Sequence, residues 1–380
     1  MTLPLEGIRV VELSHMVMGP SCGMILADLG AEVIKVEPRG DGDKTRRLPG
    51  SGSGLFATFN RNKKSIQLDI HDAEDLDILL ALLDTSDVLV ENFRGGKMQS
   101  YGLGYETLKA RNPGLVYCSL KGFLPGPYGD RSALDEVVQM LGGLAYMTGP
   151  PGRPLRAGAS VNDIMGGMFG VIGIQGALRT REITGEGAHL TSSLFENNVF
   201  LVGNHMVQAQ TTGEEVQPMS NRIPAWAVYD IFRTAGGGQI FVAAVSDTQF
   251  ASMCRAFGLD DLASDITLAT NTGRVAARQT IHESLQRRLD ELPLEEIERI
   301  CDEADLSYAR VNTPSDLVDD PHLTQTGGLV ETQTSGSDSA LVPLLPLLID
   351  GQRLEKRSEV PFPGEHDAEV LDPLRKRNNP

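Results

Sequence analysis

The sequence has few cysteines and no closely spaced ones. Its 380 residues include four Cys, at positions 22, 118, 254 and 301, with no CxxC pair among them. A disulfide framework or a zinc ribbon needs closely spaced cysteines, so neither is expected. The seven histidines show no HxH or HxxxH pairing, which leaves a metal site without support from the sequence. We therefore expect reduced thiols, a cytoplasmic location and no metal.

Basic residues are also scarce. Lys and Arg together number 34, against 51 Asp and Glu, which gives a formal net charge of −17. Nucleic-acid binding requires a basic surface, so no nucleic-acid partner is expected. An anionic ligand would have to enter a local basic pocket, because the overall field repels it.

Long apolar runs are missing as well. The first ten residues, MTLPLEGIRV, lack the basic region and apolar run of a signal peptide. The longest apolar stretch, residues 165–178, is short for a bilayer crossing and rich in glycine, which is typical of a buried helix. No membrane partner is expected.

Strand and helix patterns alternate through the first half of the chain. Apolar runs at residues 8–13 and 31–36 predict strands, with a Gly-Pro-Ser turn at 19–21 and a helix at 24–29 between them. Such βαβ units form a parallel sheet with helices on both faces, so the fold class is α/β. The pattern continues with strands at 65–68, 88–90 and 115–120, and helices at 73–83, 105–111, 135–147 and 163–180.

A polar stretch at residues 208–225 is the predicted linker between two domains. The first domain, residues 1–207, is large enough to hold its own core. Residues 226–329 predict a smaller α+β domain, and residues 330–380 are expected to return to the large domain. In the small domain we expect strands at 229–234 and 239–245, and helices at 248–257, 275–290 and 294–304.

Two features of the large domain could bind an anion. The turn after the first strand reads MGPSCG (18–23) and lacks the G-x-G-x-x-G of a dinucleotide site, so an ordinary α/β turn is favoured over NAD binding, although Glu37 stands where a ribose-binding acid would. Basic residues also follow the predicted strands, where ligands of open α/β sheets bind. The spacing of these basic residues alone favours solvated charges on the surface over a shared anion site. These residues are Arg39, Arg46, Arg61, Lys63, Lys64 and Arg94.

Asp163 begins an apolar, glycine-rich helix in the segment GASVNDIMGGM (158–168). An aspartate at a helix start is most often a cap that accepts backbone N–H bonds. A carboxylate in that position, beside glycines, is also accessible to a substrate and could attack a thioester. The residues alone leave both interpretations open and favour the cap.

A series of short segments occurs in order along nearly the whole chain. They are LEGIRV (5–10), GP (19–20), LGAEVIKVE (29–37), GDKTR (42–46), NKKSI (62–66), ENFR (91–94), GLGY (102–105), GF and GPY (122–128), TGEG (184–187), SLFE (193–196), DDP (319–321) and PGEH (363–366). In this order and spacing the chain resembles the family III CoA-transferases, a group related to the 2-methylacyl-CoA racemases. The resemblance implies a Rossmann-like large domain, a smaller domain and an interlocked homodimer.

The same resemblance implies an activity. An acyl-CoA and a carboxylic acid would be the substrates, with no cofactor bound permanently, and Asp163 would carry the acyl group covalently. The resemblance places the contacts to CoA, the pantetheine and the thioester at Val17, Met18, Arg39, Asn62, Lys63, Lys64, Asn92, Phe93, Arg94, Ser132, Ala133, Leu134 and Asp135.

Differences from the related enzymes make some of their reactions less expected for this chain. The racemases have a histidine where this chain has Leu134, so two-base proton transfer would lack a base. A racemase-type isomerase remains the alternative; a non-catalytic CoA-binding protein would be expected to lack Asp163. The oxalate enzymes have a tyrosine at position 134, a glutamine at position 17 and a glycine-rich loop between the domains.

The stretches 121–131, 134–136 and 153–160 resemble the dicarboxylate-handling branch of this family, which includes mesaconyl-CoA C1–C4 and succinyl-CoA-dependent transferases. This resemblance implies a small dicarboxylate such as mesaconate or succinate as the substrate. Arg131, Arg153 or Arg156 could hold its distal carboxylate through two hydrogen bonds. Which of them does so, and whether Glu136 or Glu196 assists Asp163, stays open.

Overall fold

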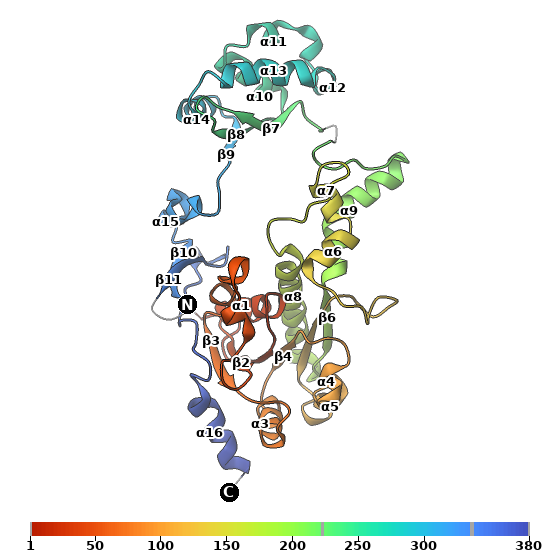
Figure 1. The fold of residues 1–380 in the computed structure, drawn as a ribbon, viewed down its shortest axis with the longest axis vertical. Coiled ribbons are helices and arrows are strands. Elements are labelled where there is room, and N and C mark those ends of the chain that lie inside the picture. The colour runs from red at the N-terminus through yellow and green to blue at the C-terminus, as the bar shows by residue number, and fades with distance from the viewer. Residues whose placement is uncertain (1, 222–223, 335–337, 379–380) are drawn as a thin grey trace. The chain divides into compact units, whose positions relative to one another are not determined.

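The computed structural model describes residues 2–221, 224–334 and 338–378. By its internal contacts the chain divides into two compact units, drawn in Figure 1. One is formed by residues 1–221 with 321–380, and the other by residues 222–320. The first five residues of the predicted linker, 208–212, belong to the helix Leu194–Thr212 rather than to a connecting loop.

The larger unit is built on a six-stranded parallel sheet. Its strands are β1 (Arg9–Leu13), β2 (Glu32–Glu37), β3 (Lys63–Gln67), β4 (Val88–Glu91), β5 (Val116–Lys121) and β6 (His189–Ser193). They lie in the order β3-β2-β1-β4-β5-β6, and every neighbouring pair is parallel. The order reverses between β1 and β4, where the loops leaving the two strands diverge and open a crevice for a ligand. The predicted parallel α/β sheet is confirmed.

Alternate residues of each strand feed two separate cores, because successive side chains of a strand point to opposite faces. Val10 and Val90 lie in the core under α1 (Met18–Asp28) and α8 (Val161–Thr184). Val11 and Leu89 lie in the other core, with α3 (Ala73–Leu83), α5 (Tyr105–Arg111) and α16 (Asp367–Asn378). The remaining helices of this unit are α2 (Leu55–Phe59), α4 (Lys97–Ser100), α6 (Asp135–Leu141), α7 (Leu144–Thr148), α9 (Leu194–Thr212) and α15 (Pro321–Gln325).

Glycines let α8 pack closely on α1. A Cβ atom at Gly167 would lie 2.2 Å from the Ser21 hydroxyl and 2.9 Å from the Cys22 backbone nitrogen. A Cβ at Gly166 would lie 2.3 Å from the Met18 side chain. Only glycine fits at such a close approach. This packing fixes the position of the first turns of α8, which carry Asp163.

Two local predictions need correction, and two elements of the larger unit were missed. The predicted Gly-Pro-Ser turn at 19–21 lies inside the first turns of α1, where Pro20 is tolerated because that N–H has no intrahelical acceptor. The predicted helix at 135–147 is two helices, since Gly143 adopts a φ of +87° between α6 and α7. Strand β6 and helix α9 were not predicted at all.

The C-terminal segment covers the edge strand β3. The Ser65 N–H donates to Nδ1 of His366 at 3.2 Å, and the Gln67 N–H donates to the Asp367 carboxylate at 2.8 Å. Lys64 extends the contact through ion pairs to Glu32 on β2, at 2.7 Å, and to Glu369 on α16, at 2.5 Å. Side chains therefore satisfy the donors that an open sheet edge would expose.

Short antiparallel pairs complete the larger unit. They are β10 (Leu329–Gln333) with β11 (Ser339–Pro343), and β12 (Leu348–Ile349) with β13 (Gln352–Arg353).

The smaller unit has an antiparallel sheet in the order β7-β8-β9, with helices packed on it. Its elements are β7 (Val228–Arg233), β8 (Gln239–Ala244), α10 (Asp247–Ala256), α11 (Asp260–Ser264), α12 (Asn271–Ala276), α13 (Arg278–Leu289), α14 (Leu294–Glu303) and β9 (Ser307–Arg310). The hairpin β7–β8 turns through Gly236 and Gly237, whose φ values of +86° and +85° suit glycine. The two predicted strands are confirmed and pair with each other, and β9 was not predicted.

Helix α8 is the one helix of the described residues whose length and hydropathy would suffice to cross a membrane. Val171, Ile174 and Leu178 on this helix are buried in the core against the sheet. Length and composition are weak criteria for a span, and this burial is typical of a core helix.

Candidate active site

A cavity of about 690 Å³ lies at the carboxyl ends of β1, β4 and β5, where the strand order reverses. The segments that follow β1 and β4 supply His15 and Asn92 to its wall, and Lys121, the last residue of β5, also lines it. The start of α8 supplies Asp163, and residues 48–59 close another side. Ligands of open α/β sheets bind at this position, so the cavity is the candidate active site.

Asp163 is the third residue of α8 and is partly buried in the cavity wall. Burial, together with the charges of Asp135 and Glu136, raises the pKa of its carboxyl group to about 7. Near neutral pH the group is therefore poised between an acid and a nucleophilic carboxylate.

Asp163 does not cap its helix, contrary to the interpretation favoured by its position in the sequence. The residue at the N-cap position, Ser160, makes no side-chain cap hydrogen bond. The Asp135 carboxylate, from α6, accepts the N–H bonds of Asn162 at 2.8 Å and of Asp163 at 3.0 Å. Asp135 therefore caps α8 from another helix and leaves the Asp163 side chain available to the cavity.

Gln139 supports this cap. Its side-chain N–H₂ donates to the other oxygen of Asp135, and its carbonyl accepts the Ala157 N–H at 2.7 Å. Gln139 is fully buried and Asp135 is 4% exposed. The two side chains thus join α6, the loop before α8 and the first turn of α8 into one hydrogen-bonded unit.

The loop after β1 is held against the loop after β4. The Asn92 side chain accepts from the His15 N–H at 3.1 Å and donates to the His15 carbonyl at 2.8 Å. The Met16 N–H donates to the Thr45 hydroxyl at 3.1 Å, and Met16 adopts a φ of +64°. These bonds place Val17 and Met18 in the cavity wall.

The predicted site residues fall into two groups. Seven of them line the cavity: Val17, Met18, Asn92, Ala133, Leu134, Asp135 and Asp163. The other seven lie outside its wall: Arg39, Asn62, Lys63, Lys64, Phe93, Arg94 and Ser132. Their roles as CoA contacts stay predictions.

Two of the outer group are buried in polar networks of the chain itself. Lys63 is 1% exposed, forms an ion pair with Glu12 at 2.7 Å and donates to the Pro20 carbonyl at 2.9 Å. Burial lowers the pKa of Lys63 to about 8. Asn62 donates to the Asp28 carboxylate at 2.8 Å and accepts from the Arg357 N–H at 2.6 Å.

The others lie closer to the surface. Arg39 pairs with Asp75 at 2.5 Å and, with Phe93, lines a separate cavity of about 390 Å³ beside the ends of β1 and β2. Arg94 donates to the Asp130 carbonyl at 3.4 Å, Lys64 bridges to α16 as described above, and Ser132 is exposed.

Sequence reasoning missed Gln139 and His15. Gln139 stands four residues after Asp135 on a predicted helix, a spacing that places the two side chains on one face and could have identified the pair. His15 directly follows the end of β1 and lines the cavity; its position after a predicted strand was an available signal.

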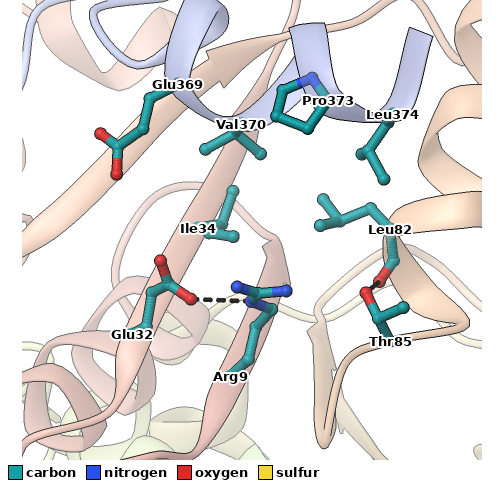
Figure 2. Close-up of a pocket in the computed structure, with 9 residues that line it drawn as sticks. All are labelled: Arg9, Glu32, Ile34, Leu82, Thr85, Glu369, Val370, Pro373 and Leu374. Carbon is teal, nitrogen blue, oxygen red and sulfur yellow. Dashed lines mark hydrogen bonds and ion pairs between the residues drawn. The ribbon is translucent and has the colours of Figure 1, made fainter. Parts of the chain in front are cut away.

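A smaller cavity of about 280 Å³ lies between α16 and the sheet, and Figure 2 shows the nine residues that line it. Arg9 and Glu32 form an ion pair across it at 2.7 Å, while Ile34 and Val370 contribute apolar walls. Its charged groups are paired with one another or with Lys64. We assign this cavity to the docking of the C-terminal helix rather than to catalysis.

Within the described ranges, no group of three or more His, Cys, Asp or Glu side chains is arranged to hold a metal ion. The four cysteines are all unpaired and buried.

The chain is similar to known proteins along nearly its whole length. The family described as CoA-transferase family III matches residues 5–367. A succinate–glutarate CoA-transferase of Agrobacterium fabrum is 33% identical, over 98% of this chain and 96% of its own length. A succinyl-CoA:mesaconate CoA-transferase of Haloarcula hispanica is 33% identical, over 97% of this chain and 96% of its own length.

The fold agrees with these sequence matches. The crystal structure of a CaiB/BaiF family protein from Brucella suis superposes with a TM-score of 0.87 and 32% identity, covering 98% of this chain and 100% of that one. The family match and the full-length relatives cover both units. The chain therefore belongs to the CoA-transferase family III.

Proposed function

We propose that this transferase moves CoA between two small dicarboxylates, with Asp163 as the covalent carrier of the acyl group. The observation that carries the proposal is the Asp163 carboxyl group, held at the start of α8 in the wall of the 690 Å³ cavity. Asp135 binds the helix N–H groups beside it. The Asp163 side chain is thereby free to react.

The reaction would proceed through two kinds of intermediate. The Asp163 carboxylate attacks the carbonyl carbon of the donor thioester, which forms a mixed anhydride and expels the CoA thiolate. That thiolate attacks the Asp163 carbonyl, which forms an aspartyl-CoA thioester and releases the donor acid. The acceptor carboxylate then attacks the aspartyl carbonyl of this thioester, which expels the CoA thiolate and forms a second mixed anhydride. The thiolate finally attacks the acceptor carbonyl of that anhydride, which gives the acceptor thioester and regenerates the Asp163 carboxylate. No proton is consumed, and the thioester bond energy is conserved.

The names of the relatives support a dicarboxylate as substrate. Those proteins are described as acting on succinate and glutarate, and on succinyl-CoA and mesaconate. The racemase alternative is not favoured, because Leu134 supplies no base to the cavity and the Asp135 carboxylate is occupied by the cap of α8.

Trapping of the acyl-enzyme tests the proposal. The protein is mixed with succinyl-CoA, quenched with hydroxylamine or borohydride, digested and analysed by mass spectrometry. We expect a hydroxamate or a reduced residue at Asp163, because both mixed anhydrides and thioesters react with these reagents. Asp163→Ala should give no adduct. An adduct on another residue, or none together with exchange of the α-proton in deuterated water, would contradict the covalent role.

We also propose that the enzyme is a homodimer. Helix α9 exposes Phe200 and Val207, which are 72% and 58% exposed, and α8 exposes Ile172 at 60%. An apolar surface of this kind usually contacts another protein. Sedimentation equilibrium should give twice the chain mass of 41.0 kDa, and a single-chain mass at micromolar concentration would refute the dimer.

A further inference from the structure

Three basic residues lie among the described residues that line the cavity: His15, Lys121 and Arg156. A dicarboxylic substrate keeps one carboxylate away from the reacting carbonyl, and that charge needs a cation once it leaves water. The contacts of the three residues decide which can provide it. This reasoning rests on the function proposed above.

Lys121 is already neutralised. Its ammonium group lies 2.6 and 2.7 Å from the two oxygens of Glu91 and donates to the Phe93 carbonyl at 2.6 Å. Glu91 is 1% exposed, so its charge cannot turn to solvent and release the lysine. His15 is a poorer cation than an arginine, because burial lowers the pKa of its ring.

Arg156 differs from both. Its guanidinium contacts one oxygen of Glu136 at 3.0 Å, and the two side chains are 44% and 48% exposed. An ion pair this exposed has little net strength, so another carboxylate can replace Glu136. A guanidinium also offers paired N–H donors that match both oxygens of a carboxylate.

The other two arginines considered from the sequence do not line the cavity. Arg131 lies over the Tyr128 ring at 4.7 Å, and Arg153 is exposed. Both lie outside the cavity wall, which leaves Arg156 as the anchor among the three.

Arg156 and Glu136 are also tied to the nucleophile. Glu136 directly follows Asp135, which caps the helix of Asp163, and Arg156 directly precedes Ala157, whose N–H is bound by Gln139. Because Gln139 also donates to Asp135, one buried network fixes the backbone of the anchor relative to the backbone of Asp163. A fixed spacing between an anchor and a nucleophile is what selection by chain length requires.

We infer that Arg156 binds the distal carboxylate of the dicarboxylic substrate, and that Glu136 holds this anchor until the substrate carboxylate replaces it. Substrate binding then exchanges one carboxylate for another on the same guanidinium, and Glu136 turns to solvent. A monocarboxylic thioester makes no such exchange and gains nothing from Arg156. The pair therefore sets the preference for dicarboxylates.

Matched thioesters test the inference. Initial rates are measured with succinyl-CoA and with butyryl-CoA, which has the same chain length but no distal carboxylate, at saturating glutarate. For Arg156→Gln we expect KM for succinyl-CoA to rise about 10- to 100-fold, as for loss of a charged hydrogen bond, with kcat/KM for butyryl-CoA unchanged. Arg156→Lys should be intermediate, since it keeps the charge but not the paired donors.

Two further variants sharpen the test. Arg153→Gln, a nearby exposed arginine outside the cavity wall, should leave both thioesters unaffected. Glu136→Gln should lower KM for succinyl-CoA several-fold, because nothing then competes for Arg156. Equal losses for both thioesters in Arg156→Gln, or a rise in KM for succinyl-CoA in Glu136→Gln, would overturn the inference.

Failure of the anchor can be told apart from failure of the proposed function. If the wild-type enzyme forms the Asp163 adduct and Arg156→Gln keeps the full preference for succinyl-CoA, only the anchor is wrong. If neither thioester labels Asp163 in the wild-type enzyme, the covalent mechanism itself is wrong.

Discussion

Replacing Asp163 by asparagine is expected to reduce turnover by at least about 10⁴-fold, the scale on which enzymes lose activity when a covalent nucleophile is removed. An amide has nearly the same shape as the carboxyl group but cannot form the mixed anhydride. Because the Asp163 backbone N–H, and not its side chain, takes part in the cap from Asp135, the variant should keep the first turn of α8 intact. The loss should appear in kcat for every acyl-CoA.

The same variant is expected to be more stable than the wild-type protein above pH 7. The folded-state pKa of Asp163 is raised to about 7 from an ordinary value of 3.8. Between these two pKa values the group is ionised in the unfolded chain but protonated in the folded protein, so the folded protein loses stability as the pH rises through this range. Below pH 4 the carboxyl group is neutral in both states, and wild type and variant should match. Above pH 7 the asparagine avoids a cost on the order of 2 kcal/mol, after allowance for partial exposure and for the neighbouring carboxylates.

Thermal unfolding at pH 5 and pH 8, beside steady-state assays, measures both effects. We expect the melting temperature of Asp163→Asn to exceed that of the wild type by a few degrees at pH 8, with a smaller difference at pH 5. Asp77→Asn, on the exposed face of α3, is the matched control and should change neither stability nor rate. Turnover within tenfold of wild type would rule out Asp163 as the nucleophile.

The second large effect is a steep acid limb in the pH dependence of kcat/KM. Only the ionised carboxylate attacks a thioester, so the rate should fall about tenfold for each pH unit below the Asp163 pKa of about 7. Above that pKa the rate should level off. A limb near pH 7 lies well above the pKa range of free carboxylic acids, so it would report the ionisation of Asp163 and not that of the substrate carboxylates.

Glu136→Gln provides the control for this limb. The charge of Glu136 is one of the causes that raise the pKa of Asp163, so its removal should move the limb to lower pH. Rates of succinyl-CoA consumption between pH 5.5 and 8.5, corrected for spontaneous hydrolysis, measure the shift. A profile that is flat from pH 5.5 to 8 would contradict the raised pKa.

The parallel sheet could be predicted because its central strands are buried on both faces. Strands β1, β2, β4 and β5 appear in the sequence as apolar runs between turn signals. Strand β6 escaped prediction because it is an edge strand with the polar sequence HLTSS. Helix α9 escaped because part of its apolar surface, including Phe200 and Leu201, is exposed rather than packed against the core of its own chain.

The candidate site contains contacts that sequence patterns could not predict. Asp163 was identified as a reactive carboxylate or a cap, but the residue that does cap the helix, Asp135, is 28 positions away and on another helix. Local spacing cannot show that two segments meet in this way. In the same manner, the position of Lys63 at the start of a strand did not reveal that its side chain points inward to Glu12.

The cover on strand β3 has a consequence for how the protein is made. The bond between Ser65 and His366 spans 301 positions, so a ribosome adds about 300 residues between the edge strand and the side chains that close it. Through that time the nascent chain presents an open strand to any neighbouring nascent chain. The yield of folded enzyme should therefore depend more on translation speed and chaperone binding than on the stability of the finished fold.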